Sequence, residues 1–382
     1  MNKVKILGQV FTPYDTAKYM TTLIKNNGLC LEPSSGDGIF LQFLKNYISI
    51  EYDKVYADKT NSLNIDFFEY DISEKFDTVI GNPPYVLYKN FLENTKKLLN
   101  SSIIDDRGNL FLHFIEKSFY HLNDNGEIIF IIPKEFLKLT SAIKLIAELM
   151  NNGTFTHILD LSEDNTFKGY GVDAIIFRYE KNNYNRDVIT FNGVFKLEIV
   201  NGFLNIKKDN EKYINFSDLF YVKVGAVSGM DKIFNHDDGI DFVFSETCST
   251  NKTKKMLYNT IHDSLLTNKE LLLNRKIKKF NDNNWFCWGR NMYNSLDDRI
   301  YVNTKTRKHN PFFINDCKNY DGSILAIFPK SKKYEIEFLK NFLNSVDWQS
   351  IGFYYNGRYI FNQKALENCI LPEKLLYEKQ KR

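Results

Sequence analysis

The sequence has few cysteines, and they are not arranged to bind a metal or to form a set of disulfides. Its 382 residues include five, at positions 30, 248, 287, 317 and 369. Their number is odd, and no two of them form a Cys-x-x-Cys pair, which excludes a zinc ribbon and a disulfide framework. We therefore expect no metal site and a protein of a reducing compartment, the cytoplasm.

Long apolar segments are also missing. No apolar run reaches the roughly 18 residues that a membrane-spanning helix needs. Residues 1–8 contain no apolar core of a signal peptide, so we expect no secretory signal and no membrane association. Internal repeats and long low-complexity linkers are absent from the sequence as well, which leaves an ordinary globular composition with 43% hydrophobic and 25% charged residues.

The charges are unevenly distributed, although the net charge is only +3. Residues 1–182 contain 19 Lys and Arg against 24 Asp and Glu, whereas residues 183–382 contain 31 against 23. Near residue 183 a strand–helix alternation also gives way to short strand-like stretches broken by Asn and Gly. We therefore expect two domains, a catalytic domain over 1–183 and a polyanion-binding domain over 184–382.

In the first of these domains, strand-like and helix-like segments alternate. Apolar runs bounded by turn residues predict strands, and apolar residues at helical spacing predict helices. The expected strands are 28–32, 76–80, 127–132, 157–161 and 172–179, and the expected helices are 39–47, 110–122 and 138–150. This alternation predicts a parallel α/β sheet with helices on both faces.

The most informative motif is Asn82-Pro83-Pro84-Tyr85, which directly follows a predicted buried strand. Ligands of open α/β sheets bind beyond the carboxyl ends of the strands. The Asn82 side-chain oxygen and the Pro83 carbonyl are two acceptors that can hold both hydrogens of an exocyclic amino group. The prolines stiffen the loop so that these acceptors are preset, and Tyr85 offers a ring for stacking. The motif therefore predicts a site that aims an amino nitrogen at an electrophile.

A second loop, from Leu31 to Gly38, follows the first predicted strand. Its glycines allow the backbone to approach a ligand closely. The loop is neither a GxGxxG fingerprint nor a Walker loop. Its acids, Glu32 and Asp37, disfavour a phosphate and suit a cationic ligand.

Five segments of the chain occur in the order found in one enzyme family. They are Gly8 to Pro13, Leu31 to Gly38, Asp66 to Phe68, Phe76 to Tyr85 and Gly108 to Phe111. In this order they resemble the gamma class of amino-methylating DNA methyltransferases, the TaqI-like adenine-N6 enzymes of restriction-modification systems. The resemblance implies an α/β, Rossmann-like S-adenosylmethionine-dependent methyltransferase domain and a C-terminal mixed α/β target-recognition domain. It also implies an adenine that is flipped out of double-stranded DNA.

The resemblance assigns cofactor contacts to individual residues. Four of them would contact the methionine end of S-adenosylmethionine: Thr12, Glu32, Ser34 and Gly36. An acid at the end of the second strand would hold the ribose hydroxyls, for which Glu51 is favoured and Asp58 is the alternative. Asp66 would accept a hydrogen bond from the cofactor's adenine amino group, and Phe67 would pack on that ring.

The same resemblance assigns the substrate contacts. Asn82 and Pro83 would orient the amino group of the target, and Tyr85 would stack on one face of the flipped base. Phe167 matches an aromatic residue that would stack on the opposite face, and Tyr170 is close enough to be an alternative. Enzymes that methylate N4 of cytosine usually have Ser in place of Asn82, so the resemblance favours adenine.

The second half resembles the family much less. The segment 222–229 looks like the opening of its specificity domain, and 357–361 with 371–372 looks like the end. Clusters of basic residues at 252–255, 275–279 and 305–308 would contact DNA phosphates, or form a solvated surface. We expect a monomer that acts on double-stranded DNA. The resemblance allows a separate cognate restriction endonuclease as a partner, and the sequence leaves open whether one exists.

Two other functions share part of these motifs. Methyltransferases of release-factor glutamine or of RNA guanine also contain Asn-Pro-Pro-Tyr. They lack an initial Phe-Thr-Pro segment, which is Phe11-Thr12-Pro13 here, and they lack a long basic second half. A non-catalytic nucleic-acid-binding relative would have lost motif residues, and all of them are present here. Both alternatives are therefore weaker than DNA adenine methylation.

Overall fold

The chain forms two compact units in a computed structural model that describes residues 10–104, 108–162 and 173–378. The first unit ends at Asn210 and the second begins at Glu211. The sequence pattern had placed the boundary at 183/184. The structure places it later because strands 187–207 continue the sheet of the first unit. The change near residue 183 therefore marks a transition from strand–helix alternation to hairpins within one unit.

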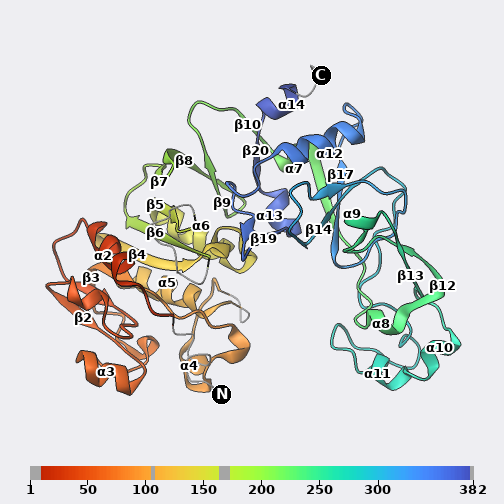
Figure 1. Cartoon of the computed structure of the whole chain (residues 1–382). Coiled ribbons are helices and arrows are strands. Elements are labelled where there is room, and N and C mark those ends of the chain that lie inside the picture. Colours follow the sequence, from red (N-terminus) through yellow and green to blue (C-terminus); the bar gives the residue numbers. More distant parts are fainter. Residues whose placement is uncertain (1–9, 105–107, 163–172, 379–382) are drawn as a thin grey trace. The chain divides into compact units, whose positions relative to one another are not determined.

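A nine-stranded sheet forms the centre of the first unit, in the order β2-β1-β3-β4-β6-β5-β7-β8-β9 (Figure 1). Its strands are β1 (Cys30–Glu32), β2 (Tyr47–Ser49), β3 (Phe76–Gly81), β4 (Leu122–Pro133), β5 (Gly153–Asp160), β6 (Ala174–Lys181), β7 (Asp187–Thr190), β8 (Gly193–Val200) and β9 (Phe203–Lys207). Strands β1 to β4 pair in parallel, as expected. The expectation of a wholly parallel sheet is wrong for β6, which lies antiparallel between β4 and β5.

Apolar side chains cover both faces of this sheet. On β4, Ile128, Phe130 and Ile132 pack in one core cluster with α5 (Leu110–Tyr120) and α6 (Ile143–Asn152). The alternate residues Ile129 and Ile131 pack on the other face with α2 (Tyr14–Thr22). A strand that is buried on both faces is apolar at every position, which explains the continuous apolar run of β4. The expected helices on both faces are confirmed.

The helix expected at 39–47 is wrong. That segment forms only the 3-10 turn η1 (Phe40–Gln42), and β2 begins at Tyr47. The backbone N–H of Cys30 donates to the carbonyl of Asn46 at 3.0 Å, so the chain must be extended there to pair with β1. The apolar spacing instead reflects packing of Phe40 and its neighbours against α2. The helix expected at 138–150 begins later, at Ile143, after two 3-10 turns (Lys134–Lys138 and Thr140–Ala142).

Shorter helices of the first unit flank the loops at the carboxyl ends of its strands. They are α3 (Lys54–Thr60), η2 (Phe67–Glu69), η3 (Tyr88–Asn90) and α4 (Glu93–Leu98). Asp53 and Asp66 precede α3 and η2, and each side chain accepts a hydrogen bond from a backbone N–H of the first turn. Capping of this kind fixes where each turn begins.

The second unit is a mixed α/β assembly of small sheets. Its main sheet has the order β11-β17-β14-β16, all antiparallel. The strands are β10 (Tyr213–Asn215), β11 (Phe220–Val224), β12 (Asn235–Phe242), β13 (Lys254–Met256), β14 (Ile300–Asn303), β15 (Lys305–Thr306), β16 (Phe312–Phe313), β17 (Ile324–Pro329), β18 (Tyr354–Tyr355), β19 (Arg358–Ile360) and β20 (Ile370–Pro372). The helices are α7 (Phe216–Leu219), α8 (Asp231–Phe234), α9 (Thr247–Thr250), α10 (Asp263–Leu266), α11 (Lys269–Leu273), α12 (Ile336–Ser345), α13 (Gln363–Glu367) and α14 (Lys374–Glu378).

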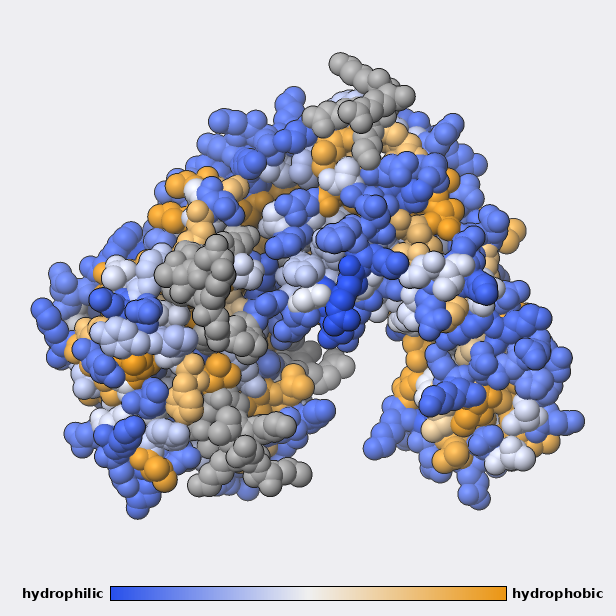
Figure 2. Space-filling view, viewed as in Figure 1, coloured by the Kyte–Doolittle hydropathy of each residue, from blue (hydrophilic) through white to orange (hydrophobic). Residues whose placement is uncertain are grey.

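The surface is predominantly hydrophilic on the face that Figure 2 shows, with smaller apolar patches between the polar residues. In the part of the chain that the structure describes, no helix is both long enough and apolar enough to cross a bilayer.

Candidate active site

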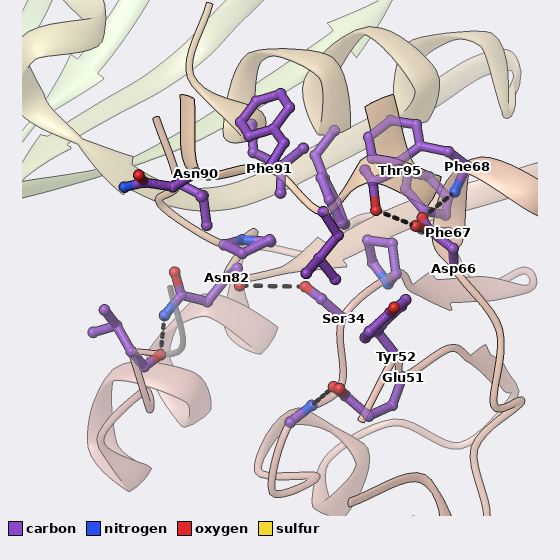
Figure 3. Close-up of a pocket in the computed structure, with 18 of the residues that line it drawn as sticks. Ser34, Glu51, Tyr52, Asp66, Phe67, Phe68, Asn82, Asn90, Phe91 and Thr95 are labelled. Atoms are coloured by element: carbon purple, nitrogen blue, oxygen red, sulfur yellow. Dashed lines mark hydrogen bonds between the residues drawn. The ribbon is translucent and has the colours of Figure 1, made fainter. Parts of the chain in front are cut away.

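The loops that follow β1 and β3 meet at the carboxyl edge of the sheet, because these two strands are hydrogen-bonded neighbours. A pocket opens there, and its lining includes residues from both loops (Figure 3). Six of the predicted site residues line it: Ser34, Gly36, Glu51, Asp66, Phe67 and Asn82. Residues that are up to 48 positions apart in the sequence therefore converge on one cavity, as expected at this edge of an α/β sheet.

Asn82 is held by the segment that precedes α2. Its side-chain Nδ2 donates to the Val10 carbonyl at 2.7 Å and to Thr12 Oγ1 at 3.1 Å. The Asn82 carbonyl accepts a hydrogen bond from Ser34 Oγ at 3.3 Å (Figure 3). Because Nδ2 faces Val10 and Thr12, the carboxamide oxygen is the acceptor end of the side chain. Thr12 thus contacts Asn82 and does not itself line the pocket. Its expected contact with the cofactor stays a prediction.

Glu51 lies just beyond β2 and is buried. Its carboxylate accepts hydrogen bonds from the backbone N–H of Gly36 at 2.7 Å and of Asp53 at 2.8 Å. Burial raises the pKa of Glu51, and these two backbone amides partly oppose that effect. Asp58, the alternative, is exposed on α3 and does not line the pocket. The geometry therefore favours Glu51 for a ligand in this cavity.

Asp66 also lines the pocket and is buried. One carboxylate oxygen accepts from the Phe68 backbone N–H at 3.0 Å, and the other accepts from Thr95 Oγ1 at 2.6 Å (Figure 3). These two bonds fix the carboxylate in one orientation. Phe67 contributes an aromatic surface beside it and packs on Phe114, with 5.0 Å between the two ring centroids. An acceptor next to an aromatic surface suits a planar heterocycle with an amino group.

Glu32 ends β1 and is fully buried. Among the described residues, no well-formed hydrogen bond reaches either carboxylate oxygen. Burial raises the pKa of Glu32 well above its usual value, although the Ser34 backbone amide opposes this. The carboxylate lies against Gly81, where a Cβ atom would come within 2.4 Å of Oε1. Glycine at position 81 therefore allows the two loops to approach each other.

The remaining predicted site residues lie beside the pocket or outside the described residues. Pro83 is buried and Tyr85 is half-buried, and neither lines the pocket. The Tyr85 hydroxyl donates to the Ile131 carbonyl at 2.9 Å, which fixes its ring beside β4. Phe167 and its alternative Tyr170 fall in the segment 163–172, outside the described residues.

The sequence did not reveal every residue that lines the cavity. Thr95 was missed because it lies on α4, 29 positions after its partner Asp66, and no motif links the two. Phe91 and Leu110 were not recognised as pocket residues for another reason: apolar residues have no pattern that separates a pocket wall from a core. Adjacency to a predicted residue signals others: Tyr52 follows Glu51, Phe68 follows Phe67, and Pro33 lies between Glu32 and Ser34.

In the second unit, the basic clusters are only partly available to a ligand. Arg275 is buried and donates to the carbonyls of Ser228, Trp285 and Cys287, so it stabilises the fold. Lys254 forms ion pairs with Asp231 and Asp321. The exposed members are Lys252, Lys255, Lys276, Lys278, Lys279, Lys305, Arg307 and Lys308.

Comparison with known proteins identifies the family of the chain. A family model described as Eco57I restriction-modification methylase matches residues 15–167. The type II methyltransferase M.HincII of Haemophilus influenzae is 31% identical over 363 residues, which cover 88% of this chain and 70% of that enzyme. The type II methyltransferase M.HindII of the same species is 38% identical over 187 residues, 46% of this chain and 36% of that enzyme.

A solved structure supports the fold. The type IIL restriction-modification enzyme MmeI, determined in complex with DNA, matches with a TM-score of 0.59 over 93% of this chain and 65% of the MmeI chain, at 13% identity. At that identity the likeness concerns the fold only. The extended similarity to M.HincII decides the family: the chain belongs to the type II DNA methyltransferases of restriction-modification systems, whose methyl donor is S-adenosylmethionine.

Proposed function

We propose that this protein transfers a methyl group from S-adenosylmethionine to N6 of an adenine flipped out of double-stranded DNA. The observation that carries the proposal is the fixed Asn82 side chain at the edge of the pocket. Its Nδ2 is held by Val10 and Thr12, which leaves the oxygen as the end that accepts from a substrate amine. Both the release-factor and the DNA enzymes need such an acceptor, but the basic second unit favours DNA.

The residues of the pocket fit the cofactor. Glu51 would hold the ribose hydroxyls, and Asp66 with Phe67 would hold the adenine. Ser34 and Gly36 would contact the methionine end at the glycine loop. Burial disfavours the charge of Glu32, and no well-formed hydrogen bond from a described residue satisfies its carboxyl, so an ammonium group bound nearby would favour its ionised form and become its partner. When bound, the cofactor supplies an electrophilic methyl group.

The catalytic loop would then act on the base. The Asn82 oxygen and the Pro83 carbonyl accept the two N6 hydrogens, which turns the nitrogen lone pair out of the ring plane and toward the methyl group. The proton that N6 loses leaves along these acceptors to water. Tyr85, fixed through its hydroxyl, would stack on the base, and Phe167 would cover the other face.

The second unit would bind the DNA, with the exposed lysines and arginines of its clusters on phosphates. A separate cognate restriction endonuclease would cleave the same sequence when it is unmethylated. We propose that the methyltransferase itself acts as a monomer, since the catalytic and DNA-binding functions are both assigned within one chain.

The test is to digest DNA from cells that express the protein to nucleosides and to analyse these by mass spectrometry. We expect N6-methyladenine in that DNA and none above background with the Asn82→Ala variant. N4-methylcytosine without N6-methyladenine would contradict the choice of base. Absence of both, with methylated glutamine or RNA guanine instead, would contradict DNA as the substrate.

A further inference from the structure

A cluster of metal-ligating side chains lies in the second unit, which contains none of the residues assigned to methyl transfer. His236 and Asp238 lie on β12, two positions apart, and His262 immediately precedes α10. The pairing of β12 with β13 is irregular between Asn235 and Ile240, so this part of the strand bulges out of the ladder. Such a bulge re-aims side chains, and here it brings β12 and the start of α10 together.

The three side chains converge on one point. His262 Nε2 lies 3.3 Å from Asp238 Oδ2, and His236 Nδ1 lies 3.6 Å from the same oxygen. One ligand atom from each residue lies within 4.8 Å of the others. Ligands that surround a tetrahedral zinc ion at about 2.0–2.1 Å are roughly 3.3 Å apart. The two distances to Asp238 are close to the spacing of a tetrahedral site.

The donor set selects the class of ion. Two imidazoles and one carboxylate suit zinc and other divalent transition metals, whereas magnesium and calcium prefer sites made of oxygen alone. Three protein ligands also leave a fourth position for water. This site differs from the expectation of no metal site, which considered only cysteines; the two histidines are 26 positions apart and no cysteine takes part.

A neighbouring hydroxyl can set the required tautomer of His262. Its Nδ1 lies 2.8 Å from Ser264 Oγ, so an Nδ1–H that donates to this hydroxyl leaves the Nε2 lone pair facing Asp238. Metal-bound histidines usually have such a partner. Two backbone contacts oppose metal binding. The N–H of Ser264 approaches His262 Nδ1 at 3.2 Å. The N–H of Asp238 approaches His236 Nδ1, also at 3.2 Å, and this is the second contact. The ion must displace the second contact, which limits its affinity.

We propose that His236, Asp238 and His262 bind a divalent transition-metal ion, with zinc as the expected ion, and that the ion ties β12 to the start of α10. The cluster is half-buried at both histidines and open at Asp238, whose side chain is 70% exposed. The ion therefore has a direct path from solvent. Because binding requires the folded arrangement, the ion stabilises the second unit.

The test is calorimetric titration of the full-length protein with zinc chloride, after treatment with a chelator and dialysis. We expect one saturable site per chain. The His262→Ala and Asp238→Asn variants should bind zinc at least tenfold more weakly, and Ser264→Ala about tenfold more weakly because the partner of Nδ1 is lost. His309→Ala is the matched control, since this exposed histidine lies outside the cluster and should leave the affinity unchanged.

Folding and binding can be separated in this experiment. Zinc should raise the melting temperature of the wild-type protein and of His309→Ala, but not that of His262→Ala. Asp238→Asn, an isosteric change at an exposed position, serves if His262→Ala does not fold. The proposal is overturned if the wild-type chain has no saturable zinc site, or if zinc binds Asp238→Asn as tightly as wild type. The cluster is then an ion pair of histidine and aspartate only.

Discussion

At the scale of single residues, the side chain of Asn82 has two ends with different partners. Its Nδ2 holds the segment around Val10 and Thr12, and its oxygen is proposed to accept from the substrate amine. We expect Asn82→Ala to lower kcat by about 10²–10³-fold, the cost of removing one preset partner of a reacting group. Cofactor affinity, measured by calorimetry, should change little.

Asn90→Ala is the matched control for this experiment, because Asn90 also lines the pocket but is exposed and belongs to no predicted motif. It should keep near wild-type activity. If Asn82→Ala lowers cofactor affinity as much as activity, the main role of Asn82 is to hold residues 10–12 through its hydrogen bonds to Val10 and Thr12. Its catalytic assignment is then wrong.

Asp66 is the second residue whose role one substitution can decide. A hydrogen bond to a charged group is worth about 1.5–3 kcal/mol, so Asp66→Ala should weaken S-adenosylmethionine binding about tenfold or more. Thr95→Val, which removes the hydroxyl that donates to Asp66, should have a smaller effect in the same direction. Asp58→Ala should bind normally, since Asp58 is exposed on α3. Equal dissociation constants for Asp66→Ala and wild type would exclude the assignment.

At the scale of elements, the sequence predicted the strands well and their pairing less well. Strands β1, β3 and β4 have apolar runs that end at turn residues, and these runs identified them correctly. The direction of β6 was not predictable, because antiparallel and parallel buried strands have the same apolar pattern. The turn at Phe40 was mistaken for a helix because apolar spacing alone does not exclude an extended connection to β2.

The part of the candidate site that could be predicted consists of motif residues at or just after the ends of strands. Asn82 and Glu32 follow or end buried strands, so their positions at the sheet edge could be anticipated. The partner of Asp66 could not, because Thr95 reaches it through the packing of α4. The contact between Thr12 and Asn82 could not be anticipated either, since the sequence does not show how the first segment crosses the loop. The expected contact of Thr12 with the cofactor stays a prediction.

Two histidines on the central elements predict how stability depends on pH. Burial lowers the pKa of His121, at the end of α5, and of His157, on β5, to about 4 each. The unfolded chain therefore binds more protons than the folded chain between about pH 4 and 6.5. The contribution of these two histidines to the unfolding free energy is fully present above pH 6.5 and is lost as the pH falls through this window. Each group contributes up to about 3 kcal/mol, at about 1.4 kcal/mol per pKa unit.

Urea unfolding at pH 7.5, 6.5 and 5.5 measures this dependence. The His121→Gln variant should lose less stability than wild type over the same range, because one of the two groups no longer titrates. Burial raises the pKa of Glu32 and Glu51, which acts in the opposite direction, but equally in both proteins. An identical pH dependence in variant and wild type would rule out His121 as a contributor.

At the scale of the whole molecule, the boundary at 210/211 predicts where the chain can be divided. Residues 184–210 contribute Val188, Leu197 and Leu204 to the core of the first unit. They also provide the partners of the buried Lys138, whose Nζ donates to the Leu204 carbonyl at 3.1 Å and to Asn205 Oδ1 at 3.3 Å. We expect a fragment of residues 1–210 to fold and bind S-adenosylmethionine, and a fragment of 1–183 to be unstable.

Circular dichroism and cofactor calorimetry on the two fragments test this expectation. Comparable folding of both would mean that β7 to β9 are dispensable to the first unit. Neither fragment should bind DNA in a sequence-specific way, because the basic clusters lie in the second unit.

DNA binding by the full chain should depend steeply on salt, because phosphate contacts release counterions. The logarithm of the affinity falls with the logarithm of the salt concentration with a slope of about −0.9 for each phosphate contact. Replacing the exposed Lys276, Lys278 and Lys279 by alanine should reduce the magnitude of this slope. Fluorescence anisotropy at several salt concentrations measures it, and a flat dependence would mean that these lysines are only solvated surface.

The antiparallel strand β6 also has a consequence for biosynthesis. β6 lies between β4 and β5, yet the ribosome makes it after both. Strands β1 to β4 can pair as they emerge. The edge of β4 that pairs with β6 has no neighbour until Lys181 has been added. In the folded protein this strand has five consecutive fully buried residues, from Ile128 to Ile132. Open apolar edges pair readily with other chains. At about 5–20 residues per second, the nascent chain is exposed in this way for roughly 2–10 s. We therefore expect slower translation between Pro133 and Lys181 to increase aggregation of the nascent chain.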